Sequence, residues 1–172
     1  METHFGFKRI TEENWLEADA GSAMFGGIAS DGQVRAFQGE DWVQRFTQPQ
    51  LNSSVPQAIH KLFEVARGCL IYGYYFYPLY TLGQEQLFRI VEAAVMQKCK
   101  IMGAPIGVRS FRNGVEWLIK QGVFDRAEVD RWGAIVELRN LASHPHEQRI
   151  IPPNWALSEL SNVADDINTL FK

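Results

Sequence analysis

Residues 57–73 read QAIHKLFEVARGCLIYG, a stretch in which the apolar residues recur three or four positions apart. This spacing places them on one face of an α-helix, which makes 3.6 residues per turn. Ser54 and Gln57 have the spacing of a capping box, with Pro56 in the first turn, and Pro78 is expected to end or kink the helix. The apolar face consists of Ile59, Leu62, Phe63, Ala66, Cys69, Leu70 and Gly73.

Four further helices are predicted downstream. Apolar residues recur at helical spacing over residues 87–98, 108–119, 125–143 and 154–171, and glycines and prolines interrupt the pattern between these stretches. Gly122 should end one helix, Asp125 should cap the next, and Asn154 or Ser158 should start the last. Because the connections are short, neighbouring helices should run antiparallel. The sequence therefore predicts an all-α fold, an antiparallel bundle of about five helices over residues 55–172.

Residues 1–54 differ in composition from the rest of the chain. They are rich in Gly, Gln, Asp and Ser, and they carry eight acidic against four basic residues. Short helices are predicted around residues 12–18 and 41–46, with loops or a small hairpin over residues 21–39. We therefore expect a less regular N-terminal segment, residues 1–54, that packs on the helical domain formed by residues 55–172.

The composition excludes several classes of protein. The 172 residues are 46% hydrophobic and 22% charged, which is typical of one globular domain rather than a disordered chain. The net charge of −3 disfavours a protein that coats nucleic acid nonspecifically. Two cysteines are too few for a disulfide framework or a zinc site. The longest uncharged run, between Arg67 and Glu85, is too short to span a membrane, and no signal peptide is recognised. We expect a cytoplasmic protein.

One residue of the predicted helix over residues 125–143 is anomalous. On a helical wheel Arg139 falls inside an apolar arc of about 180°. A guanidinium stays protonated in proteins, so it needs a carboxylate, carbonyl groups, a ligand or a hydrated groove. The simplest interpretation is an ion pair with an acid such as Glu92 or Glu116, or a stem that covers apolar surface. The arc consists of Val129, Trp132, Ile135, Val136, Leu138 and Ala142.

His144 is a second candidate site residue, at the end of the same predicted helix. It lies five residues after Arg139 and directly before Pro145, which disfavours helical angles in the residue that precedes it. His144 is therefore expected at the helix end, where its ring turns independently of the wheel. A helix C-terminus also favours a cationic imidazole. Arg139 and His144 can then converge on one small anion, which the arginine holds with its planar fork while the histidine transfers protons.

Residues 137–144, ELRNLASH, resemble the signature of the HEPN superfamily, named from higher eukaryotes and prokaryotes nucleotide-binding. That signature is an Arg followed by a polar residue, with a His after four to six intervening residues. Arg139, Asn140 and His144 match the Arg, the polar residue and the His in that order. The resemblance covers residues 55–172 and is nearest to bacterial stand-alone members of unknown function.

The resemblance implies a helical bundle that forms a homodimer with its motifs facing each other across a cleft. Active members are metal-independent endoribonucleases in which the RNA 2′-hydroxyl attacks the scissile phosphate, so no metal or cofactor is implied. His144 would act as general acid–base, Arg139 would stabilise the developing charge, and Asn140 would orient the histidine or the phosphate. Many members are toxins or defence proteins, often paired with a nucleotidyltransferase-like antitoxin, and single-stranded RNA is the implied substrate.

Other interpretations of the same residues stay open. Many HEPN members are noncatalytic domains that bind or regulate a protein or nucleotide partner, and the acidic net charge is compatible with such a role. His144 and His146 suggest a metal site, but no third histidine stands at ligand spacing, so a polar loop is expected there. The aromatic run over residues 72–80 holds no basic residues, so we expect it to form core and helix contacts rather than to stack bases.

Overall fold

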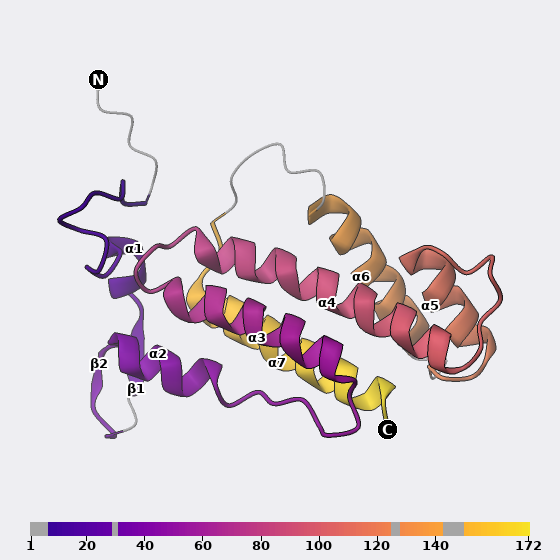
Figure 1. Ribbon diagram of the computed structural model, residues 1–172. Helices are drawn as coiled ribbons and strands as arrows, with labels where there is room; N and C mark the ends of the chain where they lie inside the picture. Colours follow the sequence, from indigo (N-terminus) through magenta and orange to yellow (C-terminus); the bar gives the residue numbers. More distant parts are fainter. Residues whose placement is uncertain (1–6, 29–30, 125–127, 143–149) are drawn as a thin grey trace.

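The computed structural model describes residues 7–28, 31–124, 128–142 and 150–172. Within these ranges the chain forms seven helices and one two-stranded antiparallel hairpin (Figure 1). The prediction of a mostly helical protein is confirmed. None of the helices in these ranges is long and apolar enough to cross a membrane. The elements are α1 Ala20–Ala23, β1 Gly26–Ile28, β2 Val34–Ala36, α2 Gly39–Phe46, α3 Gln57–Tyr72, α4 Leu79–Ile101, α5 Phe111–Lys120, α6 Val129–Ala142 and α7 Pro153–Leu170.

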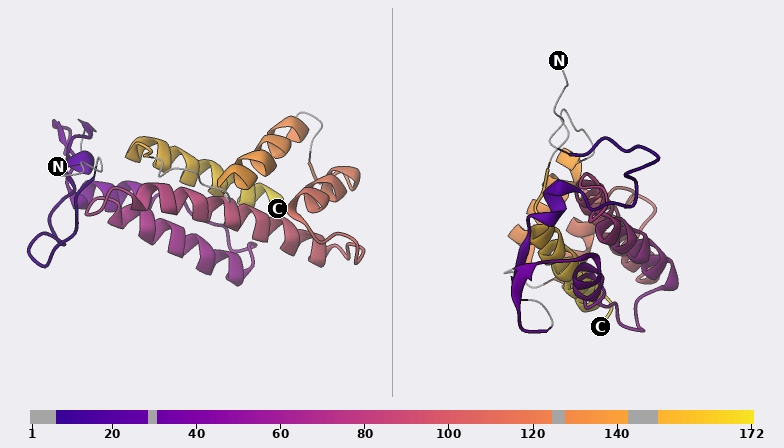
Figure 2. Two further views of the ribbon diagram at one scale, coloured as in Figure 1. Left: turned by 90° about the horizontal axis from the view of Figure 1, so that it is seen from above. Right: turned by 90° about the vertical axis from the view of Figure 1, so that its left-hand side faces the viewer.

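Helix α4 lies at the centre of the helical part, where it contacts α3, α5, α6 and α7 (Figure 1). The chain reverses between Tyr72 and Leu79, so α3 and α4 run antiparallel, and α7 lies alongside both of them (Figure 2). Each large apolar side chain buried between these helices contributes about 1.5–3 kcal/mol to stability. The fully buried side chains that join α3, α4 and α7 include Phe63, Leu70, Leu87, Ile90, Leu160 and Ile167.

Gly122 ends helix α5. Gly122 has a φ of 71°, in the left-handed region that side chains with a Cβ rarely adopt. The N–H of Gly122 donates to the carbonyl of Ile119 at 3.0 Å, and the N–H of Val123 donates to that of Leu118 at 3.0 Å. This pair of bonds is a Schellman motif, which satisfies carbonyls that the helix leaves unbonded. Gly122 therefore terminates α5, as the sequence predicted, and directs the chain towards α6.

Two predictions about the ends of α3 and α4 were wrong. The capping box of Ser54 and Gln57 does not form, because Pro56 is itself the N-cap residue of α3 and no side chain caps the helix. Proline has no N–H to donate and a fixed φ, so it starts the helix without a capping partner. Likewise Pro78 does not end α3, which stops at Tyr72, but is the N-cap residue of α4.

Residues 12–16 form turns where a short helix was predicted. The Asn14 side chain gives the reason, because its Oδ1 accepts from the N–H of Thr11 at 2.8 Å and its Nδ2 donates to the carbonyl of Arg9 at 2.9 Å. Such local side-chain bonds compete with the backbone bonds of a helix. The β1–β2 hairpin, by contrast, falls within the stretch predicted as loops or a hairpin, and α2 includes residues 41–46.

A buried carboxylate fastens the N-terminal segment to the α3–α4 connection. Asp19 accepts hydrogen bonds from the N–H of Tyr77 at 3.1 Å and from the N–H of Gly21 at 3.0 Å. Its own N–H donates to the carbonyl of Tyr74 at 2.9 Å. A buried carboxylate is costly unless hydrogen bonds replace its hydration, and here backbone N–H groups do so. The bonds fix the N-terminal segment at the end of the fold where α3 turns into α4.

Candidate functional site

Helix α6 carries two of the three predicted site residues, Arg139 and Asn140. Trp132 and Val136 form the buried face of α6, and the Trp132 ring stacks on the ring of Phe124 with 4.3 Å between centroids. Arg139 follows Val136 by three residues and is partly buried, so it lies on the same side of the helix. The anomaly seen on the wheel is therefore present in the fold: a guanidinium lies beside the apolar face of α6.

Leu138 departs from the predicted apolar arc, since its side chain is 46% exposed. Helix α6 packs mainly against α4 and α5, which cover only one side of it. Consecutive helical residues lie about 100° apart, so Leu138 turns away from the side that Arg139 occupies. The buried face of α6 is narrower than the sequence predicted, and Arg139 lies near its edge.

Glu92 of α4 binds the Arg139 guanidinium. Arg139 Nε donates to Glu92 Oε2 at 2.7 Å, and Arg139 Nη2 lies 2.6 Å from the same oxygen. The side chains of Arg139 and Glu92 are 30% and 27% exposed, so the pair is in contact with solvent. Glu92 is one of the acids expected as a partner. A pair this exposed contributes about 0–1 kcal/mol to stability, so its main effect is to orient the guanidinium.

The remaining predicted site residues are placed as follows. Asn140 is exposed on α6, beside Arg139 in the chain. His144 lies outside the described residues, as does His146. The meeting of Arg139 with His144 therefore stays a prediction. The part of the site that is described is a guanidinium oriented by a carboxylate at the solvent-facing edge of α6.

Two further ion pairs, neither of them predicted from the sequence, join α6 to its neighbours. Arg131 Nη2 lies 2.6 Å from Asp166 Oδ1 of α7, and Glu137 pairs with Arg112 of α5. Together with the Arg139–Glu92 pair, these contacts link α6 through charged side chains to α4, α5 and α7. Opposite charges on facing helices favour one arrangement over others, so the pairs help to fix the position of α6.

Asp166 is the buried member of its ion pair. Its side chain is 8% exposed, and burial raises the pKa of the carboxyl from 3.8 to about 6. Arg131 opposes this rise, but its side chain is 49% exposed, and water screens its charge. The charges of Glu128 and Asp165 add to the rise. Asp166 therefore binds a proton more readily in the folded protein than in the unfolded chain.

Asp166→Asn should remove a pH dependence of stability between about pH 4 and pH 6. Because the folded pKa of Asp166 is the higher one, the folded state binds more protons in this window, and its stability falls as pH rises from 3.8 to about 6. Asn keeps the size and an oxygen that accepts from Arg131, but it does not titrate. Urea unfolding at several pH values measures the slope of the free energy of unfolding. Glu116→Gln, which removes an exposed carboxyl on α5, should keep the wild-type slope. An unchanged slope in Asp166→Asn would contradict the shift.

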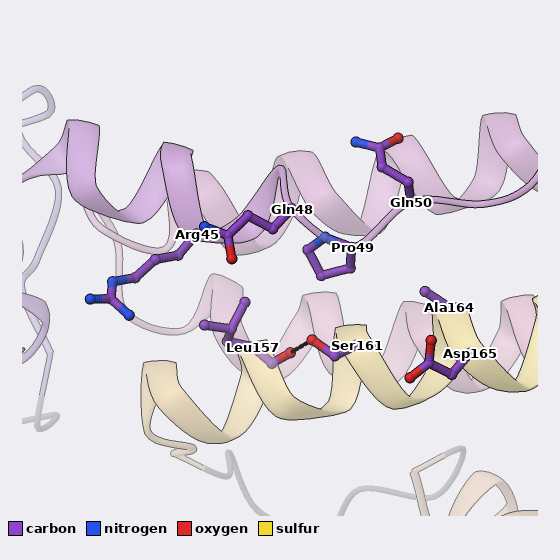
Figure 3. A pocket seen from close by; sticks show the side chains of 8 residues that line it. All are labelled: Arg45, Gln48, Pro49, Gln50, Leu157, Ser161, Ala164 and Asp165. Carbon is purple, nitrogen blue, oxygen red and sulfur yellow. Dashed lines mark hydrogen bonds between the residues drawn. The ribbon is translucent and has the colours of Figure 1, made fainter. Parts of the chain in front are cut away.

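Two cavities lie away from α6. One, of about 330 Å³, separates the α2–α3 connection from α7 (Figure 3). Ser161 donates to the Leu157 carbonyl at 3.0 Å and Arg45 to the Ile28 carbonyl at 2.7 Å, so these polar groups already have partners. The second cavity, of about 300 Å³, lies between α2 and the end of α3. No predicted site residue lines either cavity. The first is lined by Arg45, Gln48, Pro49, Gln50, Leu157, Ser161, Ala164 and Asp165.

Within the described ranges, no group of three or more His, Cys, Asp or Glu residues is placed to hold a metal ion. Comparisons with known proteins found no match: no family model, curated protein or solved structure matches the chain. The likeness to the HEPN superfamily therefore rests on the Arg139–His144 motif and on the helical character of the chain.

Proposed function

We propose that this protein is a HEPN-like antiparallel helical bundle that cleaves single-stranded RNA without a metal ion. The observation that carries the proposal is the placement of Arg139. Its guanidinium is held by Glu92 through two nitrogens, and 30% of the side chain remains exposed. A cation fixed in this way needs little reorganisation to bind a phosphate that approaches from solvent.

In the proposed reaction the RNA 2′-hydroxyl attacks the adjacent phosphorus, and the 5′-oxygen of the next nucleotide leaves. His144 acts as general acid–base for the protons that these two oxygens lose and gain. Arg139 stabilises the negative charge that develops on the phosphorane oxygens, and Asn140 orients His144 or the phosphate. The products are a 2′,3′-cyclic phosphate and a 5′-hydroxyl. No metal ion is needed to generate the nucleophile, because the substrate supplies it.

The proposal predicts that the purified protein cleaves single-stranded RNA in the presence of EDTA. His144→Ala should lower the cleavage rate by about 10²–10⁴, the usual contribution of general acid–base catalysis. Gel electrophoresis of an end-labelled RNA measures the rate, and mass spectrometry identifies the cyclic phosphate. His60→Ala is the matched control, because His60 of α3 lies outside the motif and should be dispensable. RNA left intact by the wild type, or cut equally well by His144→Ala, would sink the proposal.

The HEPN resemblance extends the proposal to partners. We propose a homodimer that brings two copies of Arg139 and His144 together, and a toxin or defence role in the cytoplasm alongside a nucleotidyltransferase-like antitoxin. The mass of the protein in solution, measured by light scattering, tests the dimer.

A noncatalytic HEPN-like domain that binds or regulates a protein or nucleotide partner is the second candidate function. The Glu92 carboxylate favours it, because it offsets the charge of Arg139 in a chain whose net charge is already −3. Such a domain would leave RNA intact, and its binding to the partner would tolerate His144→Ala. The cleavage experiment therefore separates the two candidates.

A further inference from the structure

The cavity between α2 and the end of α3 is lined mainly by aromatic and apolar residues. Its volume of about 300 Å³ is at the lower end of the range for small-molecule sites. Helix α2 lies beside the end of α3 (Figure 1), and one side of α2 faces the cavity while Trp42 and Phe46 pack in the core. The exposed side chain of Val43 marks the opening to solvent. The lining consists of Gly39, Glu40, Val43, Gln44, Ile71, Tyr74 and Tyr75.

Tyr74 and Tyr75 form an aromatic corner in this lining. Their ring centroids lie 5.2 Å apart and their ring planes meet at 76°, so the two rings supply walls that are nearly perpendicular. Gly39 leaves the corner open, because a Cβ at this position would lie 3.4 Å from the Tyr74 ring and 3.7 Å from the Tyr75 hydroxyl oxygen. The face of an aromatic ring is the negative part of its quadrupole, and it attracts cations.

Glu40 adds a carboxylate to the same cavity. Among the described residues that line it, Glu40 alone is charged. Within the described ranges no hydrogen bond or ion pair engages its side chain, since Arg35, which feels the charge of Glu40, is bound by Asp41 at 2.6 Å. Burial raises the pKa of Tyr74, and nearby negative charges, those of Glu40 and Asp41 among them, raise it further. The potential at the Tyr74 ring is therefore negative.

The charges of the surrounding segments do not cancel this potential. Residues 31–45 carry three acids and two arginines, and residues 68–78 carry no charge. The second arginine, Arg45, lies over the Phe37 ring and donates to the Ile28 carbonyl at 2.7 Å. The cavity thus combines two aromatic walls, an unpaired carboxylate and a negative local balance of charge.

We propose that this cavity binds a small organic cation that carries a trimethylammonium group, which packs against the rings of Tyr74 and Tyr75 and is attracted by Glu40. A primary ammonium suits the cavity less well, because it is compact and strongly hydrated and would need polar partners in place of its water. A trimethylammonium group has no N–H to satisfy and presents methyl groups to the rings. The proposal concerns a site away from α6 and is independent of RNA cleavage.

Titration of the full-length protein with choline, followed by NMR of the N-methyl signal of the ligand, tests the proposal. The control ligand is the neutral carbon isostere of choline, an alcohol in which a tert-butyl group replaces the trimethylammonium group. Choline should bind about 5- to 30-fold more tightly than this alcohol, as expected for a partly desolvated cation–π contact. A parallel titration with trimethyllysine shows whether a free small molecule or a modified lysine side chain is the better source of the group. Equal affinity for choline and its isostere, or no binding of either cation, would overturn the proposal.

Two substitutions of Tyr75 separate the aromatic face from a structural role. Tyr75→Leu keeps an apolar side chain but removes the ring, so the affinity for choline should fall by about 5- to 30-fold. Tyr75→Phe keeps the ring and should bind choline as the wild type does. Thermal unfolding followed by circular dichroism establishes that both variants are folded. A folded Tyr75→Leu variant with wild-type affinity would show that the aromatic corner does not hold the cation.

Glu40→Gln removes the charge but keeps the size of the side chain. It should weaken choline binding about 2- to 5-fold, the usual effect of an exposed pair of charges, and leave the binding of the neutral alcohol unchanged. Glu116→Gln is the matched control, because it removes an exposed carboxyl from α5 and changes the net charge equally. Its affinity for choline should equal that of the wild type. Equal losses in the two variants would overturn the role of Glu40.

Discussion

Arg139→Ala should lower the rate of RNA cleavage by about 10²–10³, the usual cost of removing one preorganised donor to the charge of a transition state. The protein should stay folded, because the Arg139–Glu92 pair is partly exposed and contributes about 0–1 kcal/mol. Single-turnover kinetics with excess protein reports the chemical step apart from binding and product release. Urea unfolding of the same samples measures any change in stability.

Two variants separate the role of Arg139 from a general effect of charge. Arg139→Lys keeps the positive charge but loses the planar fork, so it should recover only part of the rate. Arg112→Ala also removes a guanidinium that pairs with an acid across an α6 contact, in this case Glu137, and it should leave the rate unchanged. Equal losses in Arg112→Ala and Arg139→Ala would contradict the direct role assigned to Arg139.

The helical fold was predictable because its core helices keep one apolar face each. The pattern fails where a close contact between helices replaces large side chains with small ones. The predicted apolar pattern of α4 begins at Leu87, although the helix itself starts at Leu79. The first turns escape the pattern because they contain Gly83, whose backbone approaches the side chain of Leu70 on α3. A glycine at such a contact reads as a break in the sequence, although it allows the two helices to pack closely.

The candidate site was predictable to the extent that a charge inside an apolar face is visible in a sequence. The same signal, a charged residue among the apolar positions of a helix, also marks Arg67 on α3 and Asp166 on α7. Both are buried, although neither was predicted as an anomalous residue. The partners could not be predicted, because they come from other segments: Arg67 donates to the Pro49 carbonyl, and Arg131 binds Asp166. Periodicity along one helix identifies an anomalous residue, while its contacts depend on how the helices pack.

Trp42→Ala should lower the free energy of unfolding by about 3–5 kcal/mol, as expected when a large aromatic side chain is removed from a core. Trp42 of α2 is 0% exposed, and its ring lies edge-on to that of Phe37, with 5.1 Å between centroids. Phe46, also on α2, faces Tyr80 of α4 at 6.2 Å. The N-terminal segment and α4 therefore share one core. Urea unfolding monitored by circular dichroism measures the loss.

Trp155→Ala removes the same side chain from an exposed position at the start of α7, where it is 57% exposed, so stability should change by no more than about 0.5 kcal/mol. Residues 37–46 would lie outside the cooperative unit if Trp42→Ala lowered the free energy of unfolding only slightly. The same would follow if an early transition left most of the helical circular dichroism signal in place. A single transition at lower urea would mean that α2 supports α4. Because α4 carries Glu92, the partner of Arg139, damage to the N-terminal core would then reach the proposed site through the helix that holds Glu92.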